Sequence, residues 1–550
     1  MCGIFALLNN NDTLDDERIK EYFNKAKHRG PENSKILKIS DNLLYGFHRL
    51  AINGLNEASN QPLVFKDCIL ICNGEIYNYN TLYSYMNSTP TTNSDCEVII
   101  HMYKKYGIDY TLNNLDGVFS FVLYDQLLNK IYIARDPYGV RPLFMLQQLN
   151  NQHINSLESE NILAFASELK QLIDIKITLC HPLFNTINIL QFKPGHYMSL
   201  DYNNNNWYIN NIISYSTTGF LIMKLLPYID ILKMIKQKFT ESVIKRIVGT
   251  SDRPVACLLS GGLDSSLVTS LVSRYIPNLQ TFSIGLEGSE DLKYAKKVAD
   301  FLHTRHHEVI IKKKDFFDII PEVIEKIESY DTTTIRASIG NYLISKYISE
   351  NSDAKVIFNG DGSDELMGGY LYFNKCPDMY EFDCECRRLL KDICYYDVLR
   401  SDRSISTNGL EPRTPFLDRG WVQFYLSLPR EYRYHPGKNK CEKYLIREAF
   451  DDGTYLPKDI LFRRKEAFSD GVANIKDKTA NIIEEQLKVY LKTNPIDLTK
   501  YLQNNLTLEQ SYYKYIYDTL YPDCDNLIPY YWMPKYIDAT DSSARTLSIY

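Results

Sequence analysis

The sequence contains no uninterrupted apolar run that is long enough to cross a bilayer. Its opening apolar stretch, from Ile4 to Leu8, is short and follows no basic leader, so no signal peptide is expected. Positive charge is not in excess either, because the net charge at pH 7 is −6, whereas a nucleic-acid partner calls for a basic surface. We therefore expect a cytoplasmic protein that binds neither membranes nor nucleic acid.

Cysteine is present but lacks a metal-binding or disulfide pattern. The twelve cysteines are scattered along 550 residues, which is typical of a reducing compartment. Neither Cys68 with Cys72 nor the set Cys384, Cys386 and Cys394 has the C-x2-C spacing of a zinc site. We interpret these cysteines as small buried side chains.

The first 195 residues predict a layered α+β domain. Strand-like runs at 43–47, 68–72, 119–124 and 130–134 are bounded by glycine, asparagine and aspartate, and helices are expected at 15–27 and 95–106. A turn at 193–195 ends this region. We place the first domain at 2–195 and a linker at 196–227, with a long hairpin inside one domain as the alternative.

From residue 228 the pattern changes to alternating strands and helices. A helix at 228–248 precedes strands at 255–259, 281–286 and 354–359, with a helix at 263–275 between the first two strands. This alternation predicts a parallel sheet. Beyond Phe416 the chain is expected to be mainly helical, and the second domain is placed at 228–550.

The segment Ser260-Gly261-Gly262-Leu263-Asp264-Ser265-Ser266 lies between a predicted strand and a predicted helix. Glycines let the backbone approach a phosphate, serine hydroxyls donate to it, and the helix N-terminus supplies N–H groups. No lysine follows the glycines, so this is not a Walker A loop. It resembles the pyrophosphate loop of ATP pyrophosphatases, although a serine and glycine helix cap without a ligand is the alternative.

A second acidic loop, residues 359–365, follows the third predicted strand. Its sequence is Asn359-Gly360-Asp361-Gly362-Ser363-Asp364-Glu365. Ligands of open parallel sheets bind at the carboxyl ends of the strands, so this loop is expected to lie beside the phosphate loop and to hold magnesium and an adenylate. A solvated acidic turn is the alternative.

Cys2 is a candidate nucleophile. Removal of Met1 would leave its thiol and a free α-amine on one residue, with reference pKa values of about 8.5 and about 7.7–8.0. Arg49 can pair with a carboxylate, and Asp95 can receive an ammonium group. Asn73 and Gly74 suit an oxyanion hole.

Together these segments resemble the glutamine-hydrolysing asparagine synthetases, a family of class II glutamine amidotransferases. The resemblance spans about residues 2–475 in consistent order. The segments that carry it are 2–4, 28–31, 48–50, 73–75, 94–97, 135–139, 260–266, 330–336, 360–365, 413–418 and 465–471. The resemblance implies an N-terminal nucleophile glutaminase domain, which is an αββα sandwich. An α/β parallel-sheet ATP pyrophosphatase domain with a helical C-terminal part is expected to follow.

For the first domain the resemblance implies glutamine hydrolysis. Cys2 would attack the side-chain amide with its own α-amine as base, and water would hydrolyse the thioester. Asn73 and Gly74 would face the oxyanion. The residues implied to bind glutamine are Arg49, Leu50, Ala51, Ile52, Asn53, Asn73, Gly74, Glu75 and Asp95.

For the second domain the resemblance implies that aspartate attacks ATP to give β-aspartyl-AMP and pyrophosphate, and that ammonia then gives asparagine and AMP. The residues implied to bind ATP are Leu259, Ser260, Gly261, Gly262, Asp264, Ser265, Ser266, Ile284, Asn359 and Gly360. Asp264 and Asp364 would hold Mg²⁺. The catalytic residues would be Asp361 and Lys465, and aspartate would be bound by Thr333, Thr334 and Arg336.

One position departs from the family pattern. Many close relatives have Ser-Gly-Glu where this chain has Asn359, Gly360 and Asp361. Asp361 keeps the acidic group but is one methylene shorter, so its implied role in accepting a proton or positioning ammonia is less secure. The departure does not argue for an inactive domain.

Two sites in one chain also suggest how they cooperate. Ammonia is protonated in bulk water and an adenylate hydrolyses there, so we expect both to be shielded and ammonia to pass inside the protein. A related amidotransferase that acts on another carboxylic acid stays open, as does a homodimer. A silent binding protein is less favoured, because it would be expected to lose Cys2 or Asp264.

Overall fold

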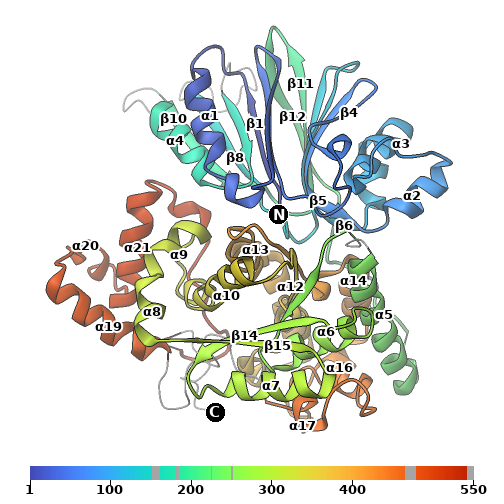
Figure 1. Cartoon of the computed structure of the whole chain (residues 1–550), viewed down its shortest axis with the longest axis vertical. Coiled ribbons are helices and arrows are strands. Elements are labelled where there is room, and N and C mark those ends of the chain that lie inside the picture. The colour runs from blue at the N-terminus through green and yellow to red at the C-terminus, as the bar shows by residue number, and fades with distance from the viewer. Residues whose placement is uncertain are drawn as a thin grey trace. The chain divides into compact units, whose positions relative to one another are not determined.

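The structure is a computed structural model that describes residues 1–150, 162–179, 185–224, 226–248, 252–464, 479–539 and 541. The chain forms two compact units (Figure 1). The first unit comprises Met1–Thr217, Gly249–Arg253 and Tyr521–Leu527, and the second comprises Thr218–Val248, Pro254–Leu520 and Ile528–Tyr550. No helix in the described part of the chain is long and apolar enough to span a membrane.

The first unit is built from two six-stranded antiparallel sheets and four helices. One sheet has the strand order β10-β8-β9-β1-β3-β2 and the other has β12-β11-β7-β6-β5-β4. The strands are β1 Gly3–Leu8, β2 Asn33–Ser40, β3 Leu43–Arg49, β4 Leu63–Phe65, β5 Cys68–Ile76, β6 Gly117–Asp125, β7 Lys130–Arg135, β8 Phe144–Asn150, β9 Leu163–Ala166, β10 Asn185–Gln191, β11 His196–Asn203 and β12 Asn206–Ser214. The helices are α1 Asp16–Asn24, α2 Tyr79–Met86, α3 Val98–Asn114 and α4 Lys170–Leu179.

Alternating side chains of β5 explain why the sheets and helices form layers. Cys68, Leu70 and Cys72 pack into a core with α2 and α3, whereas Ile69 and Ile71 pack into a core with β1 and β3 of the other sheet. Figure 1 shows α1 and α4 together on one outer side of the sheet pair and α2 and α3 on the other. The result is a four-layer arrangement. The burial of Cys68, Cys72, Cys386 and Cys394 agrees with their interpretation as small buried side chains, whereas Cys384 is exposed and the interpretation is wrong for it.

The prediction of a linker at 196–227 is wrong for its first part. β11 and β12 form a hairpin whose first strand also pairs with β7, so residues 196–214 complete a sheet of the first unit. This is the alternative hairpin interpretation. The polar residues that suggested a linker form the tip of the hairpin, where Asn204 and Asn205 take positive φ values of 46° and 65°.

A segment far along the chain, Tyr521–Leu527, also contributes to the first unit. Lys176 on α4 donates from its Nζ to the carbonyl oxygens of Pro522 and Asp523, at 3.3 and 2.6 Å. The 3-10 helix η7, Asp525–Leu527, packs beside β10. The first unit is therefore discontinuous in sequence.

The second unit surrounds a five-stranded parallel sheet with the order β15-β14-β13-β16-β17. Its strands are β13 Val255–Leu258, β14 Gln280–Leu286, β15 Arg305–Ile311, β16 Val356–Phe358 and β17 Glu411–Arg413. Its helices include α5 Tyr228–Val248, α6 Leu263–Ser273, α7 Glu290–Leu302, α8 Lys313–Asp318, α9 Ile320–Ile327, α10 Thr332–Asn351, α11 Ser363–Met367, α12 Met379–Asp392, α13 Asp397–Ser406, α14 Arg419–Ser427, α15 Arg430–Arg433, α16 Tyr444–Ala449 and α17 Lys458–Leu461. The parallel sheet and its helices confirm the α/β prediction.

The strand order places a topological switch between β13 and β16. After β13 the chain forms β14 and β15 on one side of that strand, and it then returns to form β16 and β17 on the other side. The carboxyl ends of strands at such a switch border a crevice that binds ligands. Both predicted loops, 260–266 and 359–365, follow these two strands directly.

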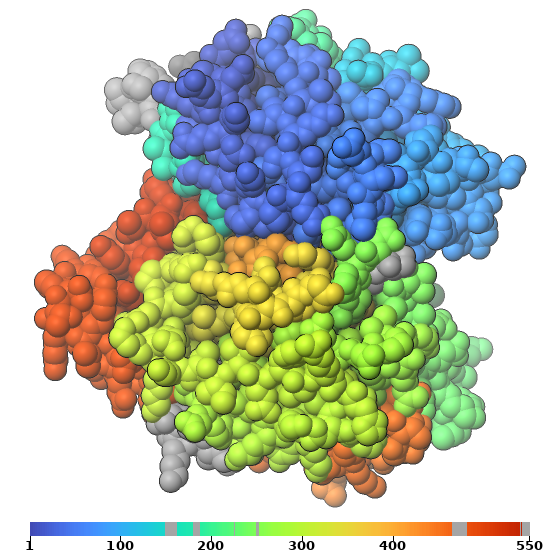
Figure 2. Space-filling model, in the orientation of Figure 1, coloured from blue at the N-terminus to red at the C-terminus, as the bar shows by residue number. Residues whose placement is uncertain are grey.

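The C-terminal part of the second unit is helical, as predicted. Helix α19 Thr479–Thr493 packs on α8, α21 Leu508–Leu520 packs on α9, and α20 Thr499–Leu502 packs on α21. Figure 2 shows this group, in red, projecting on one side of the unit.

Candidate functional site

Cys2 stands immediately before β1, one of the inner strands of its sheet. Its Sγ donates to the carbonyl oxygen of Leu50 at 3.5 Å. Its own carbonyl accepts from Nε of Arg29 at 2.9 Å. The thiol is partly buried and packs at the edge of the core between the sheets. It is therefore held beside the segment that follows β3, which contains four of the residues predicted to bind glutamine: Leu50, Ala51, Ile52 and Asn53.

Arg49 shapes that segment. Its guanidinium donates to the carbonyl oxygens of Asn53, Gly54 and Asn56 and to Oδ1 of Asn60. Burial lowers the pKa of Arg49, and the nearby Cys2 and Glu32 oppose this shift. The structure thus gives the side chain a loop-forming role, and direct contact between Arg49 and glutamine stays a prediction.

Asn73 and Glu75 lie two residues apart on β5, so their side chains share the face that carries Ile69 and Ile71 toward the other sheet. Oε2 of Glu75 accepts from Nδ2 of Asn53 at 2.6 Å. The amide of Asn73 is buried, and neither its oxygen nor its nitrogen has a hydrogen-bond partner among the described residues. A buried amide without a partner is costly, and it is what an oxyanion donor requires.

Asp95 is buried and fixed by the backbone. Its Oδ2 accepts from the N–H of Ile76 at 2.6 Å. Glu97 organises the preceding loop, because its carboxylate accepts from the backbone and hydroxyl groups of Thr91 and Thr92. The motif at 94–97 therefore contains Asp95, a candidate binding residue, and Glu97, a carboxylate with a structural role. The spacing of the motif did not predict the role of Glu97.

The motif at 135–139 is structural. The carboxylate of Asp136 accepts from the N–H groups of Phe119, Tyr138, Val140 and Arg141. A turn with so many converging donors needs an acceptor at its centre.

In the second unit, the phosphate loop connects β13 to α6. Oγ of Ser260 and Oγ of Ser265 lie 2.9 Å apart, and the N–H of Gly262 points to Oγ of Ser260 at 3.4 Å. Gly261 has φ = 71°, and a Cβ there would lie 2.4 Å from the backbone nitrogen of Ala295 on α7. The loop therefore gathers hydroxyl and N–H donors at the start of a helix, where an anion binds.

The two predicted loops press against each other at Gly360. A Cβ at this position would lie 2.8 Å from both Cβ of Asp264 and the backbone nitrogen of Ser265. Only glycine fits this approach. The amide of the preceding Asn359 donates to Oγ of Ser401 at 2.7 Å, which fixes the start of the loop.

Asp264 and Asp364, the predicted metal ligands, are brought together around one ammonium group. Nζ of Lys443 lies 2.8 and 2.7 Å from the two carboxylate oxygens of Asp264 and 2.7 Å from Oδ1 of Asp364. Oγ of Ser363 also donates to Asp264 at 2.6 Å. Lys443 is buried. Two carboxylates that share a cation, with a hydroxyl beside them, form an oxygen donor set that suits Mg²⁺.

Asp361 belongs to a second charged group. Its Oδ1 accepts from Nη2 of Arg400 at 3.0 Å, and the same nitrogen donates to Asp397 at 2.7 Å. Oδ2 of Asp361 is buried without a partner among the described residues. Burial raises the pKa of Glu365 well above its usual range, and Asp397 raises it further. Although burial acts in the opposite direction, Arg400, through its charge and its hydrogen bond, lowers the pKa of Asp397.

A single cavity collects most of the predicted ATP-binding residues. Those that line it are Leu259, Ser260, Gly262, Asp264, Ser265, Ile284, Asn359 and Gly360, together with Asp361, Asp364 and Thr333. Gly261 and Ser266 do not line it. The cavity also takes in residues that the sequence analysis missed: Asp291, Asn341, Tyr370, Asp397, Arg400, Lys443, Arg447, Arg463 and Arg464. Of these, only Arg463 and Arg464 adjoin a recognised motif.

The three residues predicted to bind aspartate are placed differently. The hydroxyl of Thr333 is buried without a partner in the described structure and faces the cavity. Thr334 donates from its N–H and its hydroxyl to Asp331, the N-cap of α10. Arg336 is paired with the carboxylates of Glu509 and Asp541 at 2.6–2.9 Å and does not line the cavity.

For Arg336, contact with aspartate stays a prediction, and its observed partners tie α10 to α21. Lys465 lies outside the described residues.

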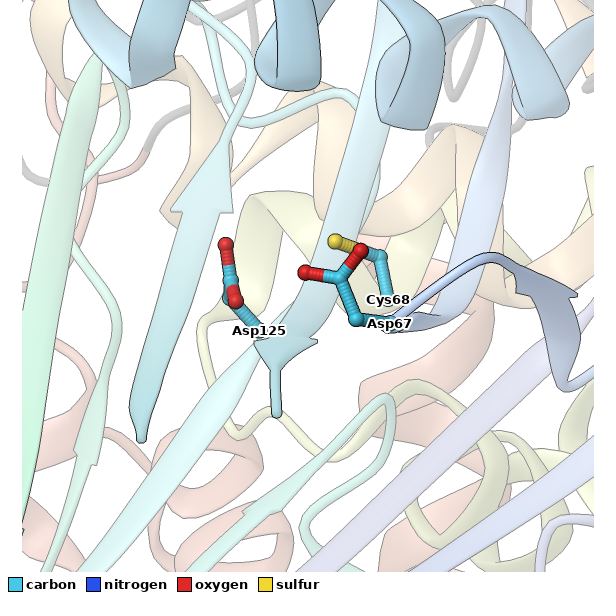
Figure 3. Close-up of side chains that lie close together, drawn as sticks. All are labelled: Asp67, Cys68 and Asp125. Atoms are coloured by element: carbon cyan, nitrogen blue, oxygen red, sulfur yellow. The ribbon is translucent and has the colours of Figure 1, made fainter. Parts of the chain in front are cut away.

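A compact group outside these sites consists of Asp67, Cys68 and Asp125, whose ligand atoms all lie within 4.8 Å of one another (Figure 3). Nζ of Lys104 pairs with Asp67 at 2.6 Å and with Asp125 at 3.7 Å, and the hydroxyl of Tyr103 donates to Asp125 at 2.8 Å. Burial raises the pKa of Cys68 to about 12, so the thiol is protonated, and Lys104 already pairs with both carboxylates.

Comparison with known proteins assigns the chain to a family. A glutamine amidotransferase domain model matches residues 1–208, and an asparagine synthase model matches residues 234–382 and 377–525. Glutamine-hydrolysing asparagine synthetases from golden hamster (Mesocricetus auratus), human and rat are 39%, 39% and 40% identical to it. Each alignment covers 100% of this chain and 99% of the relative. The chain belongs to the glutamine-hydrolysing asparagine synthetase family.

Family membership confirms the resemblance seen in the motifs. It also confirms that the chain combines a glutamine amidotransferase domain with a synthetase domain, as predicted for a glutamine-dependent ligase. The match continues through residue 525, well beyond the last motif recognised in the sequence.

Proposed function

We propose that this protein makes asparagine from aspartate, glutamine and ATP, releasing glutamate, AMP and pyrophosphate. The proposal rests on one observation: both reactive centres are present in a chain that aligns over its full length with the synthetases. The first centre is Cys2 with the unpartnered amide of Asn73. The second is the phosphate loop with Asp361 beside it.

Glutamine hydrolysis is proposed to occur in the first unit, which we assign to the N-terminal nucleophile fold. After removal of Met1, the α-amine of Cys2 takes the thiol proton and the thiolate attacks the amide carbon of glutamine. Nδ2 of Asn73 and the N–H of Gly74 stabilise the oxyanion. The α-ammonium returns its proton to the leaving nitrogen, which departs as ammonia, and water hydrolyses the thioester to glutamate.

The residues that bind glutamine are proposed to be Glu75, Asp95 and the loop shaped by Arg49. Asp95 is buried and fixed against β5, which suits it to receive the substrate's ammonium group. The loop from Leu50 to Asn53 supplies backbone groups close to the thiol. Arg49 supports this loop and contributes positive charge for the substrate carboxylate.

Amide synthesis is proposed to occur in the second unit, which we assign to the ATP pyrophosphatase fold. The β-carboxylate of aspartate attacks the α-phosphorus of ATP and expels pyrophosphate. The phosphate loop holds the pyrophosphate through Ser260, Gly262 and Ser265. Ammonia then attacks the acyl carbon of β-aspartyl-AMP and expels AMP. Asp361 receives the extra proton of the attacking nitrogen through its unpartnered Oδ2.

The donor set around Asp264 and Asp364 fits Mg²⁺, which would neutralise phosphate charge when bound. Lys443 already places positive charge beside both carboxylates, and Lys465 is proposed to support the phosphates. Thr333 is proposed to contact the aspartate substrate. Ammonia is proposed to pass between the sites without mixing with bulk water.

One assay tests the proposal. The purified full-length protein is incubated with ATP, Mg²⁺, aspartate and glutamine, and asparagine and AMP are measured. Equal formation of the two products is expected, and replacement of aspartate by other carboxylic acids should give no amide. Formation of ADP in place of AMP, or of a different amide, would contradict the proposal.

Four further measurements address the details. Mass spectrometry of the active protein should find Met1 removed. Labelled ammonium added during glutamine turnover should be largely excluded from asparagine, and full mixing would contradict internal transfer. Sedimentation tests the proposed homodimer, and cell fractionation tests the proposed cytoplasmic location.

A further inference from the structure

Lys443 places its ammonium group at the point where the two predicted metal ligands of the second unit converge. Nζ of Lys443 lies 2.8 and 2.7 Å from the carboxylate oxygens of Asp264 and 2.7 Å from Oδ1 of Asp364. It also lies 3.3 Å from Oγ of Ser363. An ammonium group has three hydrogens to donate, so these four oxygens satisfy it completely.

The backbone directs the side chain of Lys443 toward the carboxylates. Lys443 is the N-cap of α16 and has φ = 57°, a left-handed conformation that a residue other than glycine rarely adopts. Its aliphatic stem passes Gly369, where a Cβ would lie 2.8 Å from Cε of Lys443 and 2.1 Å from Oδ1 of Asp364. Such a conformation persists where the surrounding structure imposes it, typically at a ligand site.

The ammonium group and a metal ion compete for the same oxygens. Mg²⁺ requires oxygen ligands at about 2.0–2.1 Å in near-octahedral geometry. The lone pairs of Asp264 and Asp364 that face each other are directed at Nζ of Lys443, and Oδ1 of Asp264 also accepts from Oγ of Ser363 at 2.6 Å. Two cations among these oxygens would also repel each other strongly, because the site is largely buried.

The cavity beside this site gives the ammonium group a second place to bind. Lys443, Asp264 and Asp364 all line the cavity that contains the phosphate loop. Phosphate oxygens bound there would accept hydrogen bonds from a lysine that had left the carboxylates. The lysine can therefore exchange its carboxylate partners for phosphate partners.

We propose that Lys443 is a resident cation that occupies the Mg²⁺ site until metal and nucleotide enter together. Without ligands, the ammonium group neutralises Asp264 and Asp364 and excludes a free metal ion. When both ligands arrive, the carboxylates bind the ion and Lys443 binds the phosphates. A metal ion alone therefore binds weakly, and metal and nucleotide strengthen each other's binding to the same extent.

This inference rests on the proposed function, but its first test uses the metal alone. Full-length wild-type and Lys443→Met proteins are titrated with Mn²⁺ in place of Mg²⁺, and free Mn²⁺ is followed by electron paramagnetic resonance. Methionine keeps an unbranched stem and removes the charge. We expect the affinity for Mn²⁺ to rise at least about tenfold in Lys443→Met, because the two carboxylates lose the competing cation.

Three further variants make this result specific. Lys245→Met is the matched control, because Lys245 also pairs with a buried carboxylate, Asp418, which keeps Arg246 as a partner at 2.7 Å. Its affinity for Mn²⁺ should stay within about twofold of the wild type, as expected for an independent site. Asp264→Asn added to Lys443→Met should remove the gain. Lys443→Gln should show the gain as well and covers the case in which Lys443→Met fails to fold.

A second readout separates displacement of the lysine from charge repulsion alone. Wild-type protein is treated briefly with acetic anhydride, and acetylation of Lys443 is measured by mass spectrometry. Lys443 is only 2% exposed and should react slowly. Excess Mg²⁺ should raise its acetylation several-fold and leave that of Lys245 unchanged.

Two outcomes would overturn the inference. One is equal affinity for Mn²⁺ in wild-type, Lys443→Met and Lys443→Gln proteins. The other is tighter Mn²⁺ binding in the variants without a rise in Lys443 acetylation in the wild type, which would place the ion beside the lysine. Absence of ammonium-driven asparagine synthesis in the wild type would instead contradict the proposed function.

Discussion

The two candidate sites hold their reactive groups by different means. Around Cys2, most contacts run from side chains to backbone atoms, and the amide of Asn73 is left without a partner in the described structure. Around the phosphate loop, charged side chains contact one another directly, as Lys443 does with Asp264 and Asp364. In the proposed reactions, the first site stabilises one developing charge, whereas the second balances several permanent charges, those of the phosphates included.

This comparison predicts that substitutions will separate the two half-reactions. Cys2→Ala should abolish glutamine-driven asparagine synthesis, because the nucleophile is lost, and should leave ammonium-driven synthesis within about twofold. Product formation with each nitrogen source is the measurement. A Cys2→Ala enzyme that still used glutamine would show that the thiol is not the nucleophile.

The charge balance of the second site gives the largest expected effect on stability. Lys443→Met should lower the free energy of unfolding by about 3–5 kcal/mol, because it leaves two partly buried carboxylates without their shared cation. Urea unfolding measures the loss, and millimolar Mg²⁺ should restore part of it.

The control is Lys296→Met, which breaks an exposed pair with Asp300 and should cost no more than about 1 kcal/mol. Equal losses in the two lysine variants would remove the distinction between the buried and exposed pairs.

The preorganised amide of the first site is tested by Asn73→Ala. Loss of one oxyanion donor should lower kcat for glutamine hydrolysis about 100- to 1,000-fold, with a smaller change in KM. Stability should fall little, because the amide has no partner to lose. Ammonium-driven synthesis serves as the internal control, and a change confined to KM would assign Asn73 to substrate binding instead.

Asp331, the N-cap of α10 in the second unit, gives this unit a predicted pH dependence of its free energy of unfolding. Burial raises its pKa to about 6, above the unfolded value of about 3.9. Its stabilising contribution is therefore fully present below about pH 4 and is lost as the pH rises through about 6. Relative to Asp331→Asn, the wild type should lose up to about 3 kcal/mol between pH 4 and pH 7. Denaturant unfolding of both proteins across this range measures the difference, and parallel pH profiles would contradict it.

Many strands, helices and loops could be predicted because their sequence patterns lie within short segments of the chain. The strands at 43–47, 68–72, 119–124 and 130–134 all appear as β3, β5, β6 and β7. The helix at 228–248 has the bounds of α5. The phosphate loop and the acidic loop meet because both follow strands on either side of the topological switch.

The sequence analysis missed site residues that lie far along the chain from the motifs they contact. Lys443 and Arg400 reach the site from segments far along the chain, and no local spacing marks either as a partner of Asp264 or Asp361. Arg336 shows the converse, since its motif predicted substrate contact while Glu509 and Asp541 pair with it in the structure. Sequence patterns report secondary structure and motif identity, whereas ion-pair partners depend on the tertiary path of the chain.

The contacts of Lys176 with Pro522 and Asp523 have a consequence for synthesis on the ribosome. These acceptors are translated 346 and 347 positions after the lysine, which at about 5–20 residues per second means a delay on the order of tens of seconds. During that interval α4 and β10 are without the segment that packs on them. The first unit therefore reaches its final form only after residue 523 has been translated, by which time residues 254–520 of the second unit have already been made.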